Sequence, residues 1–185
     1  ALLAALEAGE AIKDFKQRHP NAEGKLRIGL EAGTVYVGHA GGGGRFVYSI
    51  VGDSANTASR VEGLNKHVGT QILATGDVVE GFENLVTRYL GAFQFVGKTE
   101  GIPIYEVMAM REKATDRQLA LRGSFKGAMV HYEQGDWQSA AAELKNVLVD
   151  FPDDGPAKFL LARCRRFMSD PENAPEPGLI RMDAK

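Results

Sequence analysis

The sequence lacks several features that would identify large classes of protein. It has one cysteine in 185 residues, Cys164, which excludes an internal disulfide and favours a reducing, cytoplasmic setting. It has 22 basic residues against 24 acidic ones, which argues against sequence-independent binding of nucleic acid. No stretch approaches the roughly 20 apolar residues of a membrane-spanning helix. The apolar residues 1–12 contain two glutamates and lack a basic start, so they do not resemble a signal peptide.

The composition is that of a folded protein with two unlike parts. Hydrophobic residues make up 44% of the chain and charged residues 25%, which are globular values. Of the 22 glycines, 17 lie in residues 1–101, so the first part is rich in turns. The second part has helical patterns, and we place the boundary between them at residues 110–115. Because the chain begins inside a helical pattern with no N-cap, we expect it to open in the middle of a domain.

The first part is predicted to mix helices with short strands. Apolar residues spaced three or four apart predict a helix over residues 1–18. A second helix should run to about His67 and end at Gly69, with Asp53 or Ser54 as its N-cap. Short apolar runs predict strands at residues 26–31, 34–40, 46–51, 71–74, 85–96 and 102–108. This pattern is typical of an α+β fold.

The start of the second helix has the side chains best suited to chemistry. Asn56 and Arg60 are four residues apart, so both project from one face of the helix near its N-terminal end. The helix dipole and free N–H groups there favour anions. An amide and a guanidinium at this place could bind a sugar oxygen and a phosphate. From spacing alone, a solvated helix face with Arg60 paired to Glu62 or Glu83 is the favoured alternative.

Three blocks of sequence resemble the second half of a class III nucleotidyl cyclase domain. In order they are Arg27 to Gly33, Tyr48 to Leu64, and Gly97 to Glu100 with Tyr105 to Val107. The resemblance covers about residues 1–110. It implies a ferredoxin-like palm of strands with helices on one face, incomplete at its N-terminus. It also implies an adenylate cyclase that converts ATP to cyclic AMP and pyrophosphate, with the site shared between two domains in a head-to-tail homodimer.

The resemblance assigns a role to five residues. Asn56 matches the asparagine that orients the ribose, and Arg60 matches the arginine that stabilises phosphate charge in the transition state. Lys98 matches a lysine that reaches the triphosphate. Ser49 matches the strand position that reads the purine, where one hydroxyl favours ATP without strongly excluding GTP. Arg45, after the glycine run, matches a further phosphate-binding arginine.

The main departure from the family is the metal site. The family binds two Mg or Mn ions through two aspartates in the first half of its domain, and neither motif occurs here. We therefore expect the chain to hold the ribose and phosphate half of the site and no metal ligands. The alternative is a non-catalytic module that binds a nucleotide or a partner. Other phosphate-binding motifs do not fit, because Gly41–Gly44 is followed by Arg45 without the Gly-Lys-Ser/Thr of a P-loop.

Residues 115–168 are predicted to form three helices that resemble a tetratricopeptide repeat and a half. The matching features are a Gly135-Asp136-Trp137 turn, the alanines that follow it, and the proline that ends the next helix. The two open interpretations are a site for a protein partner and three helices that cover the cyclase domain. Trp137 should be largely buried against Tyr132 or Ala141. Residues 169–185, with three prolines, are expected to be disordered.

Overall fold

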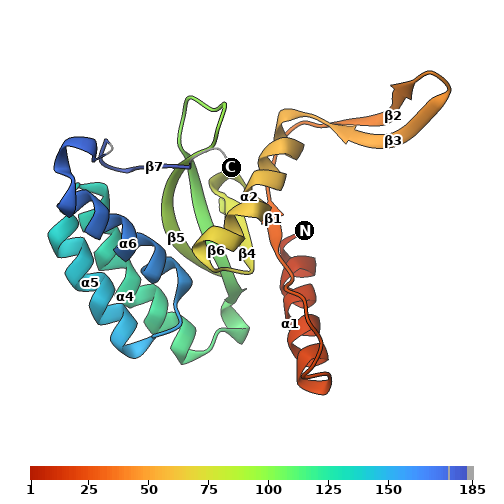
Figure 1. Ribbon diagram of the computed structural model, residues 1–185. Coiled ribbons are helices and arrows are strands. Elements are labelled where there is room, and N and C mark those ends of the chain that lie inside the picture. The colour runs from red at the N-terminus through yellow and green to blue at the C-terminus, as the bar shows by residue number, and fades with distance from the viewer. Residues whose placement is uncertain (175, 183–185) are drawn as a thin grey trace.

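In the computed structural model, which describes residues 1–174 and 176–182, the chain forms two sheets and two layers of helices (Figure 1). The main sheet has the strand order β1-β4-β6-β5-β7, and β2 pairs with β3 in a separate hairpin. The strands are β1 Ile28–Leu30, β2 Tyr36–Gly42, β3 Arg45–Val51, β4 Ile72–Thr75, β5 Leu85–Gln94, β6 Ile102–Met110 and β7 Leu179–Arg181. The α-helices are α1 Leu2–Arg18, α2 Asp53–Val68, α3 Gly76–Val79, α4 Asp116–Glu133, α5 Trp137–Asp150 and α6 Gly155–Ser169. Two short 3-10 turns, η1 and η2, cover Arg111–Lys113 and Pro171–Asn173.

These elements confirm the α+β class and most of the predicted element positions. The predicted pair of strands around the glycine-containing turn at residues 97–101 is the antiparallel pair β5–β6. Helix α2 ends at Gly69 in the left-handed conformation, as its sequence indicated. The three helices of residues 115–168 are also present, and α4 begins with a reciprocal capping box between Thr115 and Gln118.

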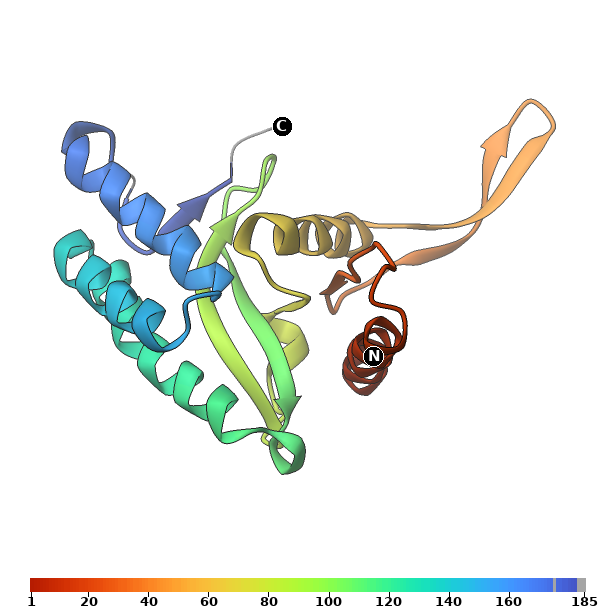
Figure 2. The ribbon, with the colours of Figure 1, turned by 60° about the horizontal axis from the view of Figure 1, so that its bottom comes forward.

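Helices cover both faces of the main sheet, which corrects the expectation of helices on one face (Figure 2). All four residues of β4 are buried, so its side chains need partners on both sides. Ile72 and Ala74 pack with α1, whereas Leu73 between them joins α2 and the C-terminal helices. The reason is the alternation of side chains along a strand, which sends neighbours to opposite faces.

The C-terminal helices share one hydrophobic core with the cyclase-like part. Their buried side chains form a single cluster with those of α2 and the sheet, and the members include Val61, Leu64, Phe93, Ile104, Phe125, Leu144, Leu160 and Ile180. Residues 110–115 therefore separate two sequence patterns but not two cores. Of the two interpretations of this segment, the structure supports helices that cover the sheet. The resemblance to a tetratricopeptide repeat stays a prediction.

The end of the chain is more ordered than its prolines indicated. Residues 179–181 form β7, which pairs in parallel with residues 92–94 of β5. Ile180 is fully buried in the shared core, and this burial outweighs the breaking effect of the prolines before it. The expected disorder of residues 169–185 is thus wrong for this strand, and residues 175 and 183–185 lie outside the described residues.

A buried ion cluster joins the sheet to the C-terminal helices. Arg88 of β5 donates from Nε and Nη2 to Glu106 of β6, at 2.9 and 2.6 Å. Its Nη2 also lies 2.8 Å from Asp154, which caps α6 through the backbone N–H of Ala157. Burial alone would lower the pKa of Arg88, but the two carboxylates raise it overall. Breaking such a cluster from one side leaves a buried charge without its partner, so it fixes where α6 can dock.

Within the described residues, no helix is long and apolar enough to cross a bilayer.

Trp137 provides a test of the shared core. Its ring is partly buried and contacts the rings of Tyr132 and Phe167, with centroid distances of 5.1 and 5.0 Å. We expect Trp137→Ala to lower the free energy of unfolding by about 2–3 kcal/mol, because these contacts are lost. Urea unfolding followed by circular dichroism should show one transition for helices and sheet together.

The matched control is Val149→Ala on the same C-terminal segment, since Val149 is 79% exposed and should cost little. Separate transitions for helices and sheet would contradict the single core.

Candidate nucleotide-binding site

Helix α2 is held against strand β1 by an unusually close backbone approach. A Cβ atom added at Gly29 would overlap the backbone nitrogen of Glu62 and the carbonyl oxygen of Ala58. Only glycine leaves room for the helix at this distance. The strand of the first sequence block and the helix that begins in the second block are therefore locked together.

A buried asparagine that sequence reasoning missed reinforces this contact. Asn65 is 1% exposed, and its Nδ2 donates to the carbonyl oxygen of Ile28 in β1 at 3.0 Å. Its Oδ1 accepts from the hydroxyl of Thr70 at 2.9 Å. The available signal was its position in line with the apolar Val61 and Val68 on the buried side of the helix. Because a buried amide must find partners, Asn65 fixes the rotation of α2.

The opposite face of α2 presents a stripe of polar side chains. Asp53, Asn56 and Arg60 lie at i, i+3 and i+7, and all three are exposed. The stripe starts at the first turn of the helix, where backbone N–H groups are free and the dipole favours negative charge. This confirms that Asn56 and Arg60 share one face, and no ion pair of Arg60 occurs in the part of the chain that the structure describes.

The expected N-cap is wrong in its detail. The helix begins at Asp53 after Gly52, and neither Asp53 nor Ser54 caps it through a side chain. The Asp53 carboxylate instead accepts a hydrogen bond from the Lys98 amine, which comes from the loop between β5 and β6. Folding brings the Lys98 amine to Asp53, and the carboxylate bonds to this amine instead of to the free N–H groups of the helix.

This contact brings Lys98 to Asp53 in the first turn of α2, which lies 45 residues earlier in the sequence. The side chain of Lys98 is 24% exposed and that of Asp53 is 76% exposed. Water therefore screens the two charges, and the ion pair is weak. A bound anion could therefore replace Asp53 as the partner of Lys98 at little cost in free energy. Lys98, Asn56 and Arg60 thus border one surface at the N-terminal half of the helix.

The two remaining predicted residues lie on the β2–β3 hairpin, which projects away from the main sheet (Figure 1). Ser49 pairs with Gly38 three residues before Gly52, close in sequence to the start of α2. Arg45 is the first residue of β3, exposed, and about 20 Å of strand separates it from Val51. Within this single chain, the structure does not bring Arg45 to Lys98, Asn56 and Arg60.

Comparison with known proteins identifies the protein family of this chain. The family model described as "Adenylate and Guanylate cyclase catalytic domain" matches residues 2–103. The chain belongs to this family. It is 38% identical over 109 residues to adenylate cyclase 1 of Rhizobium meliloti, covering 58% of this chain and 16% of that protein. It is 36% identical over 120 residues to the adenylate cyclase of Anabaena cylindrica, covering 59% and 24%.

The chain thus spans at most about a quarter of the length of these cyclases. Among solved structures, the adenylyl cyclase CyaB from P. aeruginosa is similar, with a TM-score of 0.45 and 22% identity. That match covers 60% of this chain and 58% of the solved one.

Cyclases of this class are generally dependent on divalent metal ions, but the residues present here do not fit such a site. The described residues contain no group of three or more histidine, cysteine, aspartate or glutamate side chains that could hold a metal ion. Asp53, the carboxylate nearest to Asn56 along the helix, is engaged by Lys98.

Gly29 offers a test of how α2 is positioned. We expect Gly29→Ala to lower the free energy of unfolding by about 3 kcal/mol, because the helix backbone must move to admit the methyl group. Gly38→Ala in β2 is the matched control, since an added Cβ there meets no atom within 4 Å. Thermal and urea unfolding measure both variants. Equal stability of the two would contradict the close packing of α2 on β1.

Proposed function

We propose that this chain supplies the ribose- and phosphate-binding half of an adenylate cyclase site, which converts ATP to cyclic AMP and pyrophosphate. The observation that carries the proposal is the position of Lys98 beside the stripe that holds Asn56 and Arg60. An amide, a guanidinium and an amine around a helix N-terminus match the oxygen-rich, anionic face of a nucleoside triphosphate.

The residues divide the substrate between them. Asn56 would hold the ribose so that its 3′ oxygen points at the α-phosphorus. Arg60 would bind phosphate oxygens as negative charge builds up on them, and Lys98 would leave Asp53 for the triphosphate. In the reaction the 3′ oxygen forms a bond to the α-phosphorus, its proton is lost, and the bond to pyrophosphate breaks. Positioning and charge stabilisation are what these side chains can provide.

ATP is the substrate that we favour over GTP. The named relatives are adenylate cyclases, and the hydroxyl of Ser49 could accept a hydrogen bond from the adenine amino group. Ser49 is partly exposed at the end of the hairpin next to α2, where a base bound beside Asn56 could reach it.

A second cyclase domain is the partner that the proposal requires, since the residues that the structure describes contain no cluster of side chains that could hold a metal ion. The β2–β3 hairpin offers a surface for it. Large apolar side chains are exposed along both of its strands: Tyr36, Val37, Val47, Tyr48, Ile50 and Val51, all between 54% and 77% exposed. Apolar surface of this kind on a projecting element is typical of a protein interface. We propose that the hairpin packs against the second domain in a head-to-tail dimer, which would also give Arg45 a neighbouring site.

Complementation tests the catalytic roles. The chain would be mixed with a cyclase domain that keeps its two metal-binding aspartates but has alanine at the positions matching Asn56 and Arg60. We expect cyclic AMP from the mixture with Mg or Mn, and none from either partner alone. Arg60→Ala should lower kcat by about 10²–10³-fold, because its contact strengthens in the transition state. Asn56→Ala should lower kcat as well, because the ribose is misaligned.

Lys66→Ala is the matched control, since it removes an exposed cation from the other end of the same helix. Variants that change KM alone would show that Asn56 and Arg60 only bind the nucleotide. Unchanged kinetics in both would contradict the assignment, and ATP binding without any turnover would favour a non-catalytic regulatory module. Cyclic AMP from this chain alone would contradict the divided site.

The hairpin is tested by self-association. Tyr48 and Ile50 are two residues apart, so they lie on one face of β3. We expect the double variant Y48S/I50S to weaken dimerisation at least tenfold in sedimentation experiments, because about two buried apolar contacts are lost. Val149→Ser changes a still more exposed apolar residue on α5 and should have no effect. A similar loss in both variants would exclude the hairpin as the interface.

A further inference from the structure

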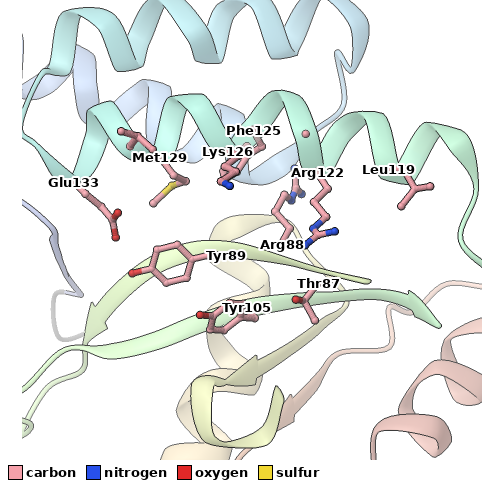
Figure 3. Close-up of a pocket in the computed structure, with 12 residues that line it drawn as sticks. Thr87, Arg88, Tyr89, Tyr105, Leu119, Arg122, Phe125, Lys126, Met129 and Glu133 are labelled. Atoms are coloured by element: carbon pink, nitrogen blue, oxygen red, sulfur yellow. The ribbon is translucent and has the colours of Figure 1, made fainter. Parts of the chain in front are cut away.

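A cavity of about 600 Å³ lies between the main sheet and helix α4 (Figure 3). Its lining comes from β5, β6 and α4, which do not carry Asn56, Arg60 or Lys98. The volume is within the range of small-molecule sites in proteins. The cavity therefore stands apart from the candidate nucleotide-binding site and depends on the C-terminal helices.

Two tyrosines form an aromatic floor. Tyr89 and Tyr105 face each other on neighbouring strands, with ring centroids 5.2 Å apart. Met129 lies above Tyr89 on α4, and Leu119 lines the cavity further along the helix (Figure 3). Aromatic surface on one side and aliphatic surface on the other suit a flat apolar group.

The helix adds positive charge to this apolar space. Arg122 and Lys126 lie one turn apart among the lining residues, and neither has an ion-pair partner among the residues that the structure describes. Glu133 is the one carboxylate in the described lining, and it lies close to the hydroxyl of Tyr89 (Figure 3). Burial and this contact raise the pKa of Tyr89, which keeps its hydroxyl protonated as a donor.

A buried group without a partner also belongs to the lining. Arg88 is 2% exposed, and its Nη1 has no hydrogen-bond partner within the described part of the chain. Glu106 and Asp154 bond only to its other two nitrogens, Nε and Nη2, and compensate its charge. A buried donor left unsatisfied costs free energy, but Nη1 is itself covered, and the guanidinium lies over the ring of Phe125 at 4.6 Å. Arg88 therefore contributes to the wall of the cavity and is not a direct partner for a ligand.

Gly123 keeps the cavity open on the helix side. It lines the cavity in the interior of α4, where an added Cβ would meet no atom within 4 Å. Glycine within a helix lowers its stability, and no neighbouring atom requires glycine here. Gly127 lies one turn further, is equally free of neighbours and does not line the cavity, so it is a natural control.

We propose that this cavity binds a small organic monoanion with a flat aromatic body. Its anionic group would pair with Arg122 and Lys126, and its ring would lie on Tyr89 and Tyr105. The proposal does not depend on the proposed cyclase function, because binding is measured on the chain itself.

The test is fluorescence titration with anilinonaphthalene sulfonate, an aromatic monoanion, and with the neutral phenylnaphthylamine. The whole chain is used in the Y48S/I50S background, so that the exposed apolar hairpin does not bind the probes. We expect R122Q/K126Q to weaken binding of the anionic probe about tenfold and to leave the neutral probe unchanged. G123L should weaken both probes at least tenfold, because its side chain fills the cavity, and G127L should weaken neither.

Circular dichroism establishes that each variant is folded. If G123L does not fold, R122Q/K126Q decides the question, since both of its side chains are exposed. The proposal is overturned if the anionic probe binds R122Q/K126Q as tightly as the unsubstituted background, or if G123L and G127L lose affinity equally.

Discussion

The packing of helix α2 on strand β1 is the contact on which the candidate site depends. Gly29 lets the two backbones meet, and Asn65 ties the helix to the carbonyl oxygen of Ile28. These contacts use the buried side of α2, so the other side is free to present Asn56 and Arg60. A helix held by backbone contact cannot rotate or slide easily, and this rigidity is what precise placement of a ribose and a phosphate needs.

The C-terminal helices extend the same rigid frame from the other end of α2. Gly69, at the end of α2, lies so close to Gly155, at the start of α6, that a side chain on either would overlap the other backbone. Asp154, next to Gly155, joins the buried ion cluster of Arg88 and Glu106. Helix α6 is thus positioned by a charge contact to the sheet and a backbone contact to α2. This arrangement makes the C-terminal segment part of the cyclase-like core.

The side chains suited to binding lie on the exposed sides of elements whose other sides are packed in the core. The stripe on α2, the apolar hairpin and the cavity under α4 are all exposed surfaces on elements whose other sides are buried. The first two are surfaces that a nucleotide and a second domain could cover. The third is an open cavity between α4 and the sheet, and α4 is held in place by the shared core at Phe125 and Tyr132.

The sequence by itself determined what is local. The spacing of apolar residues placed the helices and strands, Gly69 marked a helix end, and the interval between Asn56 and Arg60 put them on one face, because these properties depend only on neighbours along the chain. The family could be identified from three blocks of residues for the same reason. What joins distant segments was decided by tertiary structure. The partnership of Lys98 with Asp53, the role of Asn65, the pairing of β7 with β5 and the merging of two sequence parts into one core all depend on side chains that meet only after folding. Arg45 shows the same limit, since its place next to the glycine turn was evident, but the direction of the hairpin that carries it away from α2 was not.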